Sequence, residues 1–166
     1  MKRLSRYLPL VLLLFLTTAW SGEEVKKADS VLVIKSEKRL YLISDGKPFA
    51  EFRVTFGANP VGHKQQRGDE RTPEGHYILD YKNANSSFYK SIHISYPNEN
   101  DRLQASMSGL DPGDNIMIHG QTNGFEWATH LVQLFPWTDG CVALRNKNMD
   151  KVWAAVDAGT PIEIKP

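Results

Sequence analysis

The chain has 166 residues, of which 41% are hydrophobic, 23% charged and 10% aromatic, with a single cysteine. These proportions fit one globular domain with a substantial core. The balance of 20 basic against 19 acidic residues removes the electrostatic case for nucleic-acid binding. One cysteine excludes an internal disulfide framework and a cysteine-rich zinc site.

The first segment has the anatomy of a secretory signal peptide. Three basic residues precede an uncharged run at 7–21, which ends in Ala-Trp-Ser, a tripeptide that resembles a cleavage site. The apolar run is shorter than the roughly 20 residues of a spanning helix, so a retained anchor is the second interpretation. We therefore expect a signal peptide at 1–21, a charged linker at 22–29 and a domain at 30–166. The mature protein would be exported to the periplasm or cell-wall compartment, without a stable membrane span.

Three short strands are predicted next, at residues 31–36, 39–44 and 49–56. Each run is rich in β-branched or aliphatic residues, and the third alternates apolar with polar side chains. Asp45-Gly46, between the second and third runs, is a strong hairpin signal. The pattern predicts three successive antiparallel strands.

A long loop is expected at 57–75, because this segment has no periodicity and is rich in Gly, Pro, Gln and charged residues. Long ordered loops in small domains are often functional. Further strands are predicted at 76–81, 91–95 and 115–119. The segment 96–113 is expected to be irregular, with at most one helical turn near 102–106.

One helix is predicted near the C-terminus, with Asn146 as its cap. Its apolar residues recur at i, i+3, i+4 and i+7, namely Met149, Val152, Trp153 and Val156. Gly159 and Pro161 would end the helix, and the alternation at 162–165 predicts a final strand. Many short strands, one helix and no βαβ alternation favour a β-rich sandwich or barrel-like fold.

The densest group of reactive residue types lies between 116 and 146. His119-Gly120 ends an apolar strand, and Cys141 follows His119 by 22 residues. A thiol with an ordinary pKa of about 8.5 is mostly protonated near neutral pH, so a nucleophilic cysteine needs a base or cation. His119 is the best-placed base, and the N–H groups of Gly140 and Cys141 could stabilise an oxyanion. The spacing favours acyl transfer but leaves a buried structural thiol as an alternative.

Several motifs, in order, resemble the L,D-transpeptidase catalytic domain, also called the YkuD domain. His119-Gly120 followed by Thr138-Asp139-Gly140-Cys141 is similar to the family signature, a His-x pair before Ser/Thr-His-Gly-Cys. The run Thr-Pro-Glu-Gly-His-Tyr at 72–77 looks like the family's Thr-Pro-x-Gly-x-Tyr turn. Residues 92–97 look like its middle segment, so the resemblance covers about 30–165.

The resemblance implies a β-rich catalytic fold and a cysteine acyltransferase that acts on peptidoglycan stem peptides. Cys141 would attack the carbonyl of the third stem residue, expel the terminal D-residue and pass the acyl group to an amine or water. His119 would be the base. The oxyanion and substrate-binding residues would be Gly120, Thr138, Asp139, Gly140, Arg145 and His93. The resemblance implies no metal and no organic cofactor.

Two positions depart from the family signature. Asp139 stands where the signature has His, and its charge disfavours a thiolate unless His119 is protonated or Asp139 points elsewhere. Ala143 stands where the common form has Arg. Arg145 would either bind a substrate carboxylate or pair on the helix surface. The Trp-Thr-Asp-Gly-Cys form resembles a branch that cleaves the peptidoglycan link to an outer-membrane lipoprotein, which makes such a lipoprotein a second candidate partner.

Alternatives to the transferase remain at this stage. One is an L,D-peptidase or carboxypeptidase that hydrolyses stem peptides or their lipoprotein link. Another is a non-catalytic cell-wall binding module disabled by Asp139, and a third is an intermolecular disulfide through Cys141.

The other histidines have structural interpretations beside the functional ones. His93 is a wall residue of an apolar strand or, by the resemblance, lines the substrate groove. His130 lies in an apolar stretch at 127–132 that predicts a short lid or helix. His63 and His76 lie at loop edges, too scattered among non-ligand residues to predict a zinc site.

Overall fold

The computed structural model describes residues 24–125, 127 and 134–166. The predicted signal peptide at 1–21 therefore lies outside the described residues, as do His130 and most of the lid predicted at 127–132. In the described part of the chain, no helix is long and apolar enough to cross a membrane.

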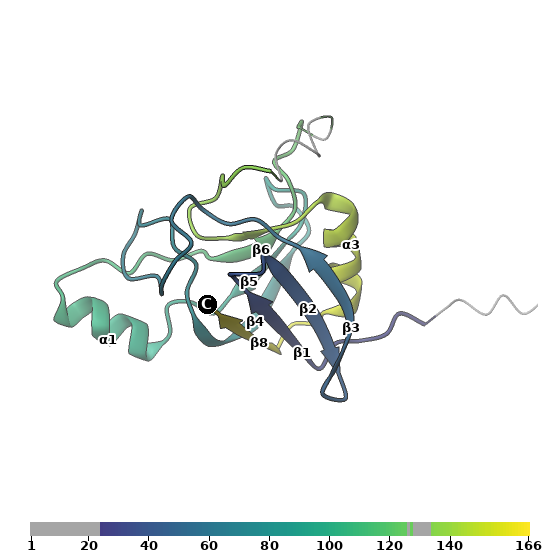
Figure 1. The fold of residues 1–166 in the computed structure, drawn as a ribbon, viewed down its shortest axis with the longest axis horizontal. Coiled ribbons are helices and arrows are strands. Elements are labelled where there is room, and N and C mark those ends of the chain that lie inside the picture. Colours follow the sequence, from purple (N-terminus) through teal and green to yellow (C-terminus); the bar gives the residue numbers. More distant parts are fainter. Residues whose placement is uncertain (1–23, 126, 128–133) are drawn as a thin grey trace, which may run out of the picture.

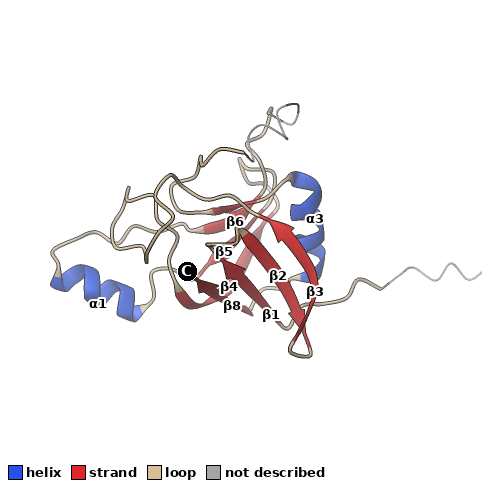
Figure 2. Cartoon of the chain, viewed as in Figure 1, coloured by secondary structure: helices blue, strands red, loops and turns tan. Residues whose placement is uncertain are grey.

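Eight strands form one mixed sheet in the order β3-β2-β1-β8-β4-β5-β6-β7, with two helices beside it (Figures 1 and 2). The strands are β1 (Ser30–Ile34), β2 (Arg39–Ser44), β3 (Lys47–Arg53), β4 (Gly75–Asn83), β5 (Ser91–Ile94), β6 (Met117–His119), β7 (Val142–Ala143) and β8 (Thr160–Lys165). The helices are α1 (Glu99–Met107) and α3 (Asn146–Ala155).

The two edges of the sheet are joined just beyond β3. Thr55 forms an isolated bridge with Ala143 of β7, in which each backbone N–H donates to the other residue's carbonyl at 3.0 Å. The segment after the first edge strand thus pairs with the last, which nearly closes the sheet. The prediction of a β-rich, barrel-like fold is confirmed.

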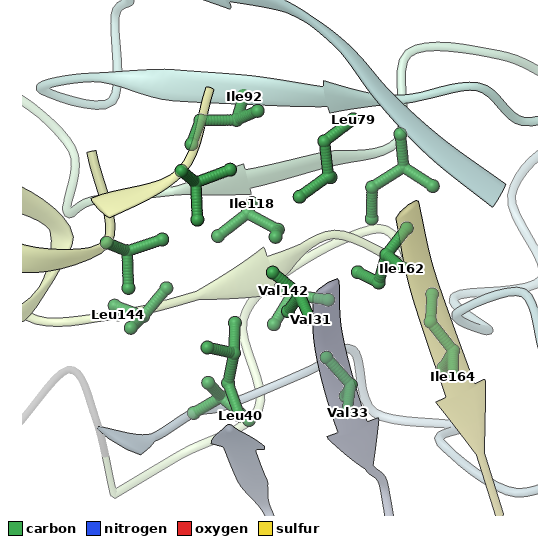
Figure 3. Close-up of a cluster of buried hydrophobic side chains, with 14 of the residues drawn as sticks. Val31, Val33, Leu40, Leu79, Ile92, Ile118, Val142, Leu144, Ile162 and Ile164 are labelled. Carbon is green, nitrogen blue, oxygen red and sulfur yellow. The ribbon is translucent and has the colours of Figure 1, made fainter. Parts of the chain in front are cut away.

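The core fills the inside of this curved sheet (Figure 3). Alternate residues of the strands point inward because successive side chains of a strand face opposite sides, so Val31, Leu40 and Ile162 are at most 1% exposed. Met149 and Val152 of α3 join the same cluster. The periodicity predicted for this helix is confirmed, and the helix covers one side of the core.

The first three strands follow the prediction closely. The pairs β1–β2 and β2–β3 are antiparallel, and Asp45 and Gly46 join β2 to β3 with φ of 53° and 70°. Two consecutive positive φ values are the requirement of a type I′ hairpin turn. Strand β3 ends at Arg53, before the predicted end at residue 56, because Thr55 turns to pair with β7.

Helix α1 was not predicted beyond a single turn, and one helix was expected where the described part of the chain has α1 and α3. Its signal is a capping box: the Asn98 side chain accepts from Asp101 N–H, and the Asp101 carboxylate accepts from Asn98 N–H. Leu103 and Met107 are 57% and 74% exposed, so the helix has no apolar stripe. A helix stabilised by its cap has no periodic hydrophobic pattern to detect.

The predicted cap of the last helix is wrong. Arg145 occupies the N-cap position and forms no side-chain capping bond. The Asn146 side chain accepts a hydrogen bond from Gln121 N–H at 2.8 Å instead. A long-range partner therefore replaces the local cap that the sequence suggested.

The loop between β3 and β4 is held by two ion pairs whose lysine side chains are 3% exposed. Lys35 Nζ lies 2.7 Å from Glu74 Oε1, and Lys64 Nζ lies 2.8 Å from Asp69 Oδ1. Asp69 also accepts the backbone N–H groups of Gln65, Gln66 and Arg71. The long loop expected at 57–75 is thus an ordered wall rather than a solvated connection.

A third pair, His63 with Asp101, ties this loop to α1. His63 Nε2 lies 3.2 Å from Asp101 Oδ1. The hydrogen bond to Asp101 raises the pKa of His63, although burial opposes it. Burial pushes the pKa of Asp101 upward, but hydrogen bonds from His63, Asn98 N–H and Tyr77 outweigh it and lower that pKa.

Replacing His63 with Gln is expected to destabilise the fold more at about pH 5.5 than at about pH 8.5. A raised histidine pKa stabilises the fold fully below its ordinary value, and this contribution is lost as the pH rises through the raised pKa. Asp101 contributes above its ordinary pKa and loses its contribution as the pH falls through the lowered one. Urea unfolding of both proteins at the two pH values measures the difference.

His76→Gln is the matched control, because the His76 side chain is 82% exposed and its Nε2 lies 3.8 Å from Glu163 Oε1. An equal pH dependence in the two variants would contradict the assignment to the His63–Asp101 pair.

Candidate functional site

The site is built on a tight turn at residues 138–141, directly before β7. Thr138 Oγ1 donates to the Cys141 carbonyl at 2.8 Å and closes the turn. Gly140 has φ of +112°, and a Cβ at this position would lie 2.4 Å from the Arg71 carbonyl oxygen. Only glycine fits both the conformation and the close approach, so the loop at 57–75 forms the wall behind Cys141.

Cys141 carries a free thiol that lines a pocket of about 740 Å³. Its Sγ lies 3.4 Å from Met117 N, which donates to it, and 3.6 Å from the Asn115 carbonyl oxygen, which accepts. Burial raises the pKa of the thiol, and the charge of Asp139 raises it further. The Met117 N–H and the Lys64 charge act in the opposite direction. The resting group is therefore a neutral thiol near neutral pH.

His119 ends β6 and lines the same pocket as Cys141. Its Nδ1 lies 2.6 Å from the Gly120 carbonyl oxygen. A carbonyl only accepts hydrogen bonds, so Nδ1 carries the proton and Nε2 keeps a lone pair. Burial lowers the pKa of His119 to about 4, although the bond to Gly120 opposes this. The imidazole is thus a neutral acceptor near neutral pH.

Aromatic side chains fix the His119 ring in place. Its centroid lies 4.7 Å from that of Phe88 and 5.4 Å from that of Trp137. Strand pairing supports the placement, because β6 and β7 are parallel with His119 opposite Ala143. The predicted base at the end of β6 and the predicted nucleophile just before β7 are therefore carried by neighbouring strands.

Gly120 has a packing role beside the base. A Cβ there would lie 2.7 Å from Asn146 Oδ1 and 2.9 Å from Tyr89 Cβ. The Gly120 N–H donates to the Lys90 carbonyl at 3.1 Å. A larger residue would push the His119 strand end away from α3.

The remaining predicted site residues divide into two groups. Thr138 and Asp139 line the pocket, the first buried and the second exposed. His93 and Arg145 are absent from the described lining. His93 Nδ1 pairs with Asp80 Oδ1 at 2.7 Å, and its ring stacks on Tyr81 at 4.6 Å. It lies opposite Met117 in the sheet and so shares the site's face at a position beyond the pocket.

Sequence reasoning missed several residues that complete the pocket. Asn115 and Met117 contact the thiol, Asp114 and Phe88 line the pocket, and the Lys64 charge reaches it from the wall loop. None belongs to a recognisable reactive motif. Their only signal is position, within or near predicted strands whose pairing the sequence does not specify. In the described part of the chain, no group of three His, Cys, Asp or Glu residues could hold a metal ion.

Comparison with known proteins supplies a family. The family model for YkuD, the L,D-transpeptidase catalytic domain, matches residues 28–164. YafK of Escherichia coli strain K12, provisionally named as an L,D-transpeptidase, is 26% identical over 132 residues, which cover 76% of this chain and 46% of YafK.

Solved structures give the same fold. The helical cell shape determining protein Pgp2 of Campylobacter jejuni has a TM-score of 0.61 and 26% identity, with 87% of this chain and 52% of Pgp2 covered. Bd1075 of Bdellovibrio bacteriovorus has a TM-score of 0.56 and 21% identity, and the match covers 84% of this chain and 51% of the Bd1075 chain. The chain thus spans about half the length of these relatives.

Proposed function

Because the chain belongs to the YkuD family of L,D-transpeptidase catalytic domains, we propose that it is an exported cysteine acyltransferase acting on peptidoglycan stem peptides. One observation carries the proposal: a buried, neutral His119 with a lone pair on Nε2 lines the same pocket as the only thiol of the chain. Such a pair supplies a nucleophile and its base.

The first half of the reaction forms a thioester. Cys141 Sγ attacks the carbonyl carbon of the third stem residue while His119 Nε2 takes the thiol proton. The C–N bond to the terminal D-residue then breaks, and His119 returns the proton to the departing amine. Because the resting pair is neutral, proton transfer accompanies the attack and no stored thiolate is required.

The second half regenerates the thiol. An acceptor amine or water attacks the thioester carbonyl, His119 takes its proton, and the C–S bond breaks with the proton returning to sulfur. An amine gives a cross-link or exchanged residue, and water gives a trimmed peptide. Both outcomes use the same groups, so the acceptor decides between transferase and peptidase.

Backbone donors support the oxyanion step. Within residues 24–125, 127 and 134–166, no hydrogen bond occupies the N–H of Gly140 or Cys141. Two free N–H groups beside a nucleophile match an oxyanion hole, in which one donor is worth roughly 3 kcal/mol.

The proposal is tested by incubating muropeptides with the full chain and with Cys141→Ala, with and without an added amine. We expect the wild type to remove the terminal D-residue, or exchange it for the amine, and the variant to turn over more than about 10³-fold more slowly. Equal thermal unfolding of the two proteins would show that the fold is intact.

Other outcomes select the alternatives. Retention of muropeptides with unchanged masses indicates a binding module. A dimer on non-reducing gels that Cys141→Ala abolishes indicates an intermolecular disulfide. Full turnover by Cys141→Ala contradicts the acyltransferase outright.

A further inference from the structure

Asp139 is an unusual neighbour for a nucleophilic thiol. It lies two residues before Cys141, is exposed and lines the same pocket. Its negative charge makes the thiolate harder to form. A carboxylate in this position therefore opposes the proposed chemistry in the free protein, so its presence calls for a role in the complex with substrate.

The charge of Asp139 is not balanced by a cation among the described residues that line the pocket. Among the residues that the structure describes, the pocket is lined by two carboxylates, Asp114 and Asp139, and by no lysine or arginine. Asp114 lies 3.4 Å from Arg67 Nη1, so a cation already partners it. Asp139 forms no ion pair with any described residue.

Neither Lys64 nor Arg145 pairs with Asp139 in the described structure. Lys64, the cation whose field reaches Cys141, is buried and pairs with Asp69 at 2.8 Å. Arg145 lies at the start of α3 and is absent from the described lining of the pocket. The pocket beside the thiol thus presents one unpaired negative charge and a neutral imidazole.

We propose that Asp139 is a specificity-determining residue that holds a substrate ammonium group beside Cys141. This inference rests on the proposed function, because the ammonium belongs to one of two reactants of the acyl transfer. It is either a side-chain amine of the stem peptide that donates the acyl group, or the amine that accepts it. An ion pair with the donor's ammonium removes the unpaired charge next to the thiol. An acceptor held as the ammonium pairs with Asp139 beside the thioester and loses a proton to solvent before its nitrogen attacks.

An ammonium on the donor peptide also prepares the nucleophile, whereas an acceptor arrives only after the thiol has become a thioester. An ammonium beside Asp139 cancels the field that disfavours the thiolate, so the sulfur becomes easier to deprotonate when the correct substrate is present. A neutral or anionic group in the same place leaves that field intact or strengthens it. Discrimination of a donor-borne ammonium therefore acts both on binding and on the attack by the thiol, and discrimination of an acceptor-borne ammonium acts on the second half of the reaction.

The first test reads the charge preference of the thiol without any turnover. The full chain is reacted with aminoethyl methanethiosulfonate, which carries an ammonium, and with neutral methyl methanethiosulfonate. In both reactions the thiolate attacks the reagent's sulfenyl sulfur, a mixed disulfide forms and methanesulfinate leaves. The ratio of the two rates cancels any change in the thiolate fraction.

We expect Asp139→Asn to lower the ratio of cationic to neutral reaction by about two- to fivefold, the range of a partly exposed ion pair. Asp114→Asn is the matched control, since it removes a carboxylate of the same pocket that Arg67 already partners. An unchanged ratio in Asp139→Asn, or an equal fall in Asp114→Asn, would overturn the proposal.

The second test separates the two sources of the ammonium. Formation of the acyl-enzyme is followed by intact mass with a stem tetrapeptide and with the same peptide acetylated on its side-chain amine. A donor-borne ammonium predicts that Asp139→Asn slows only the unacetylated peptide. An acceptor-borne ammonium predicts unchanged acylation and a lower share of aminolysis over hydrolysis.

Equal effects of Asp139→Asn on every substrate and step would overturn the specificity role. Absence of an acyl-enzyme in the wild type with both peptides would contradict the proposed function instead, while the reagent ratio would still report on the charge preference of Asp139.

Discussion

Replacing His119 with Gln is expected to lower kcat/KM on muropeptides by about 10²- to 10⁴-fold, the usual contribution of a general base. Glutamine has no basic nitrogen to take the Cys141 proton, although it preserves polarity at a buried position. The measurement is the initial rate of loss of the terminal D-residue, with circular dichroism to check the fold.

The pH profile gives the same prediction an independent readout. Burial holds the pKa of His119 at about 4, so kcat/KM of the wild type should stay level on acidification until the pH approaches that value. Below it the imidazole is protonated and cannot act as the base. The residual kcat/KM of His119→Gln should show no such fall at low pH.

His93→Gln is the control for this variant. His93 lies on the same face of the sheet but does not line the pocket in the described structure. We expect its kcat/KM to stay within about threefold of the wild type, far from the loss of a catalytic base. Comparable losses in the two variants would show that His119 acts structurally.

Replacing Gly140 with Ala is expected to abolish activity and to destabilise the fold. Two causes add: a φ of +112°, which side chains rarely adopt, and a Cβ only 2.4 Å from the Arg71 carbonyl oxygen. The backbone of the wall loop must move to relieve the contact, which displaces Cys141 from its hydrogen-bond partners.

Gly159→Ala isolates the first cause, because Gly159 has φ of +94° and open space around its missing Cβ. We expect Gly140→Ala to lose about 1–3 kcal/mol more unfolding free energy than Gly159→Ala, the typical cost of overpacking. Urea denaturation of both variants measures the difference. Equal losses of unfolding free energy in the two variants would mean that the backbone at Arg71 moves aside at no energetic cost.

The sequence predicts those parts of the fold that local chemistry decides. The turn at Asp45-Gly46 and the apolar face of α3 each follow from a few adjacent residues, and the structure has both. Helix α1 was missed because its stability comes from a capping box and from Asp101, which accepts hydrogen bonds from Tyr77 as well as from within the helix. The cap at Asn146 was wrong because a distant N–H competes for its side chain.

The candidate site likewise has parts that the sequence predicts and parts that only the fold decides. His119 and Cys141 could be predicted because reactive residue types stand out beside glycines in a sequence. Their neutral resting state could not, since it depends on how deeply the fold buries each group. Likewise, Asp114 and Phe88 line the pocket and Arg145 is absent from its described lining, because the pairing of distant strands decides which connecting segments meet there. These are long-range outcomes without a local signature.

The bridge between Thr55 and Ala143 has a consequence for folding. It joins residues 88 positions apart in the chain, and such distant contacts are slow to form because a long loop must close first. Val142 and Ala143 pair with β6 on one side, and Ala143 also pairs with Thr55, which follows the N-terminal strands. Because Cys141 directly precedes β7, its placement in the pocket of His119 depends on this long-range pairing, and a chain in which the two edges of the sheet have not met lacks the assembled site.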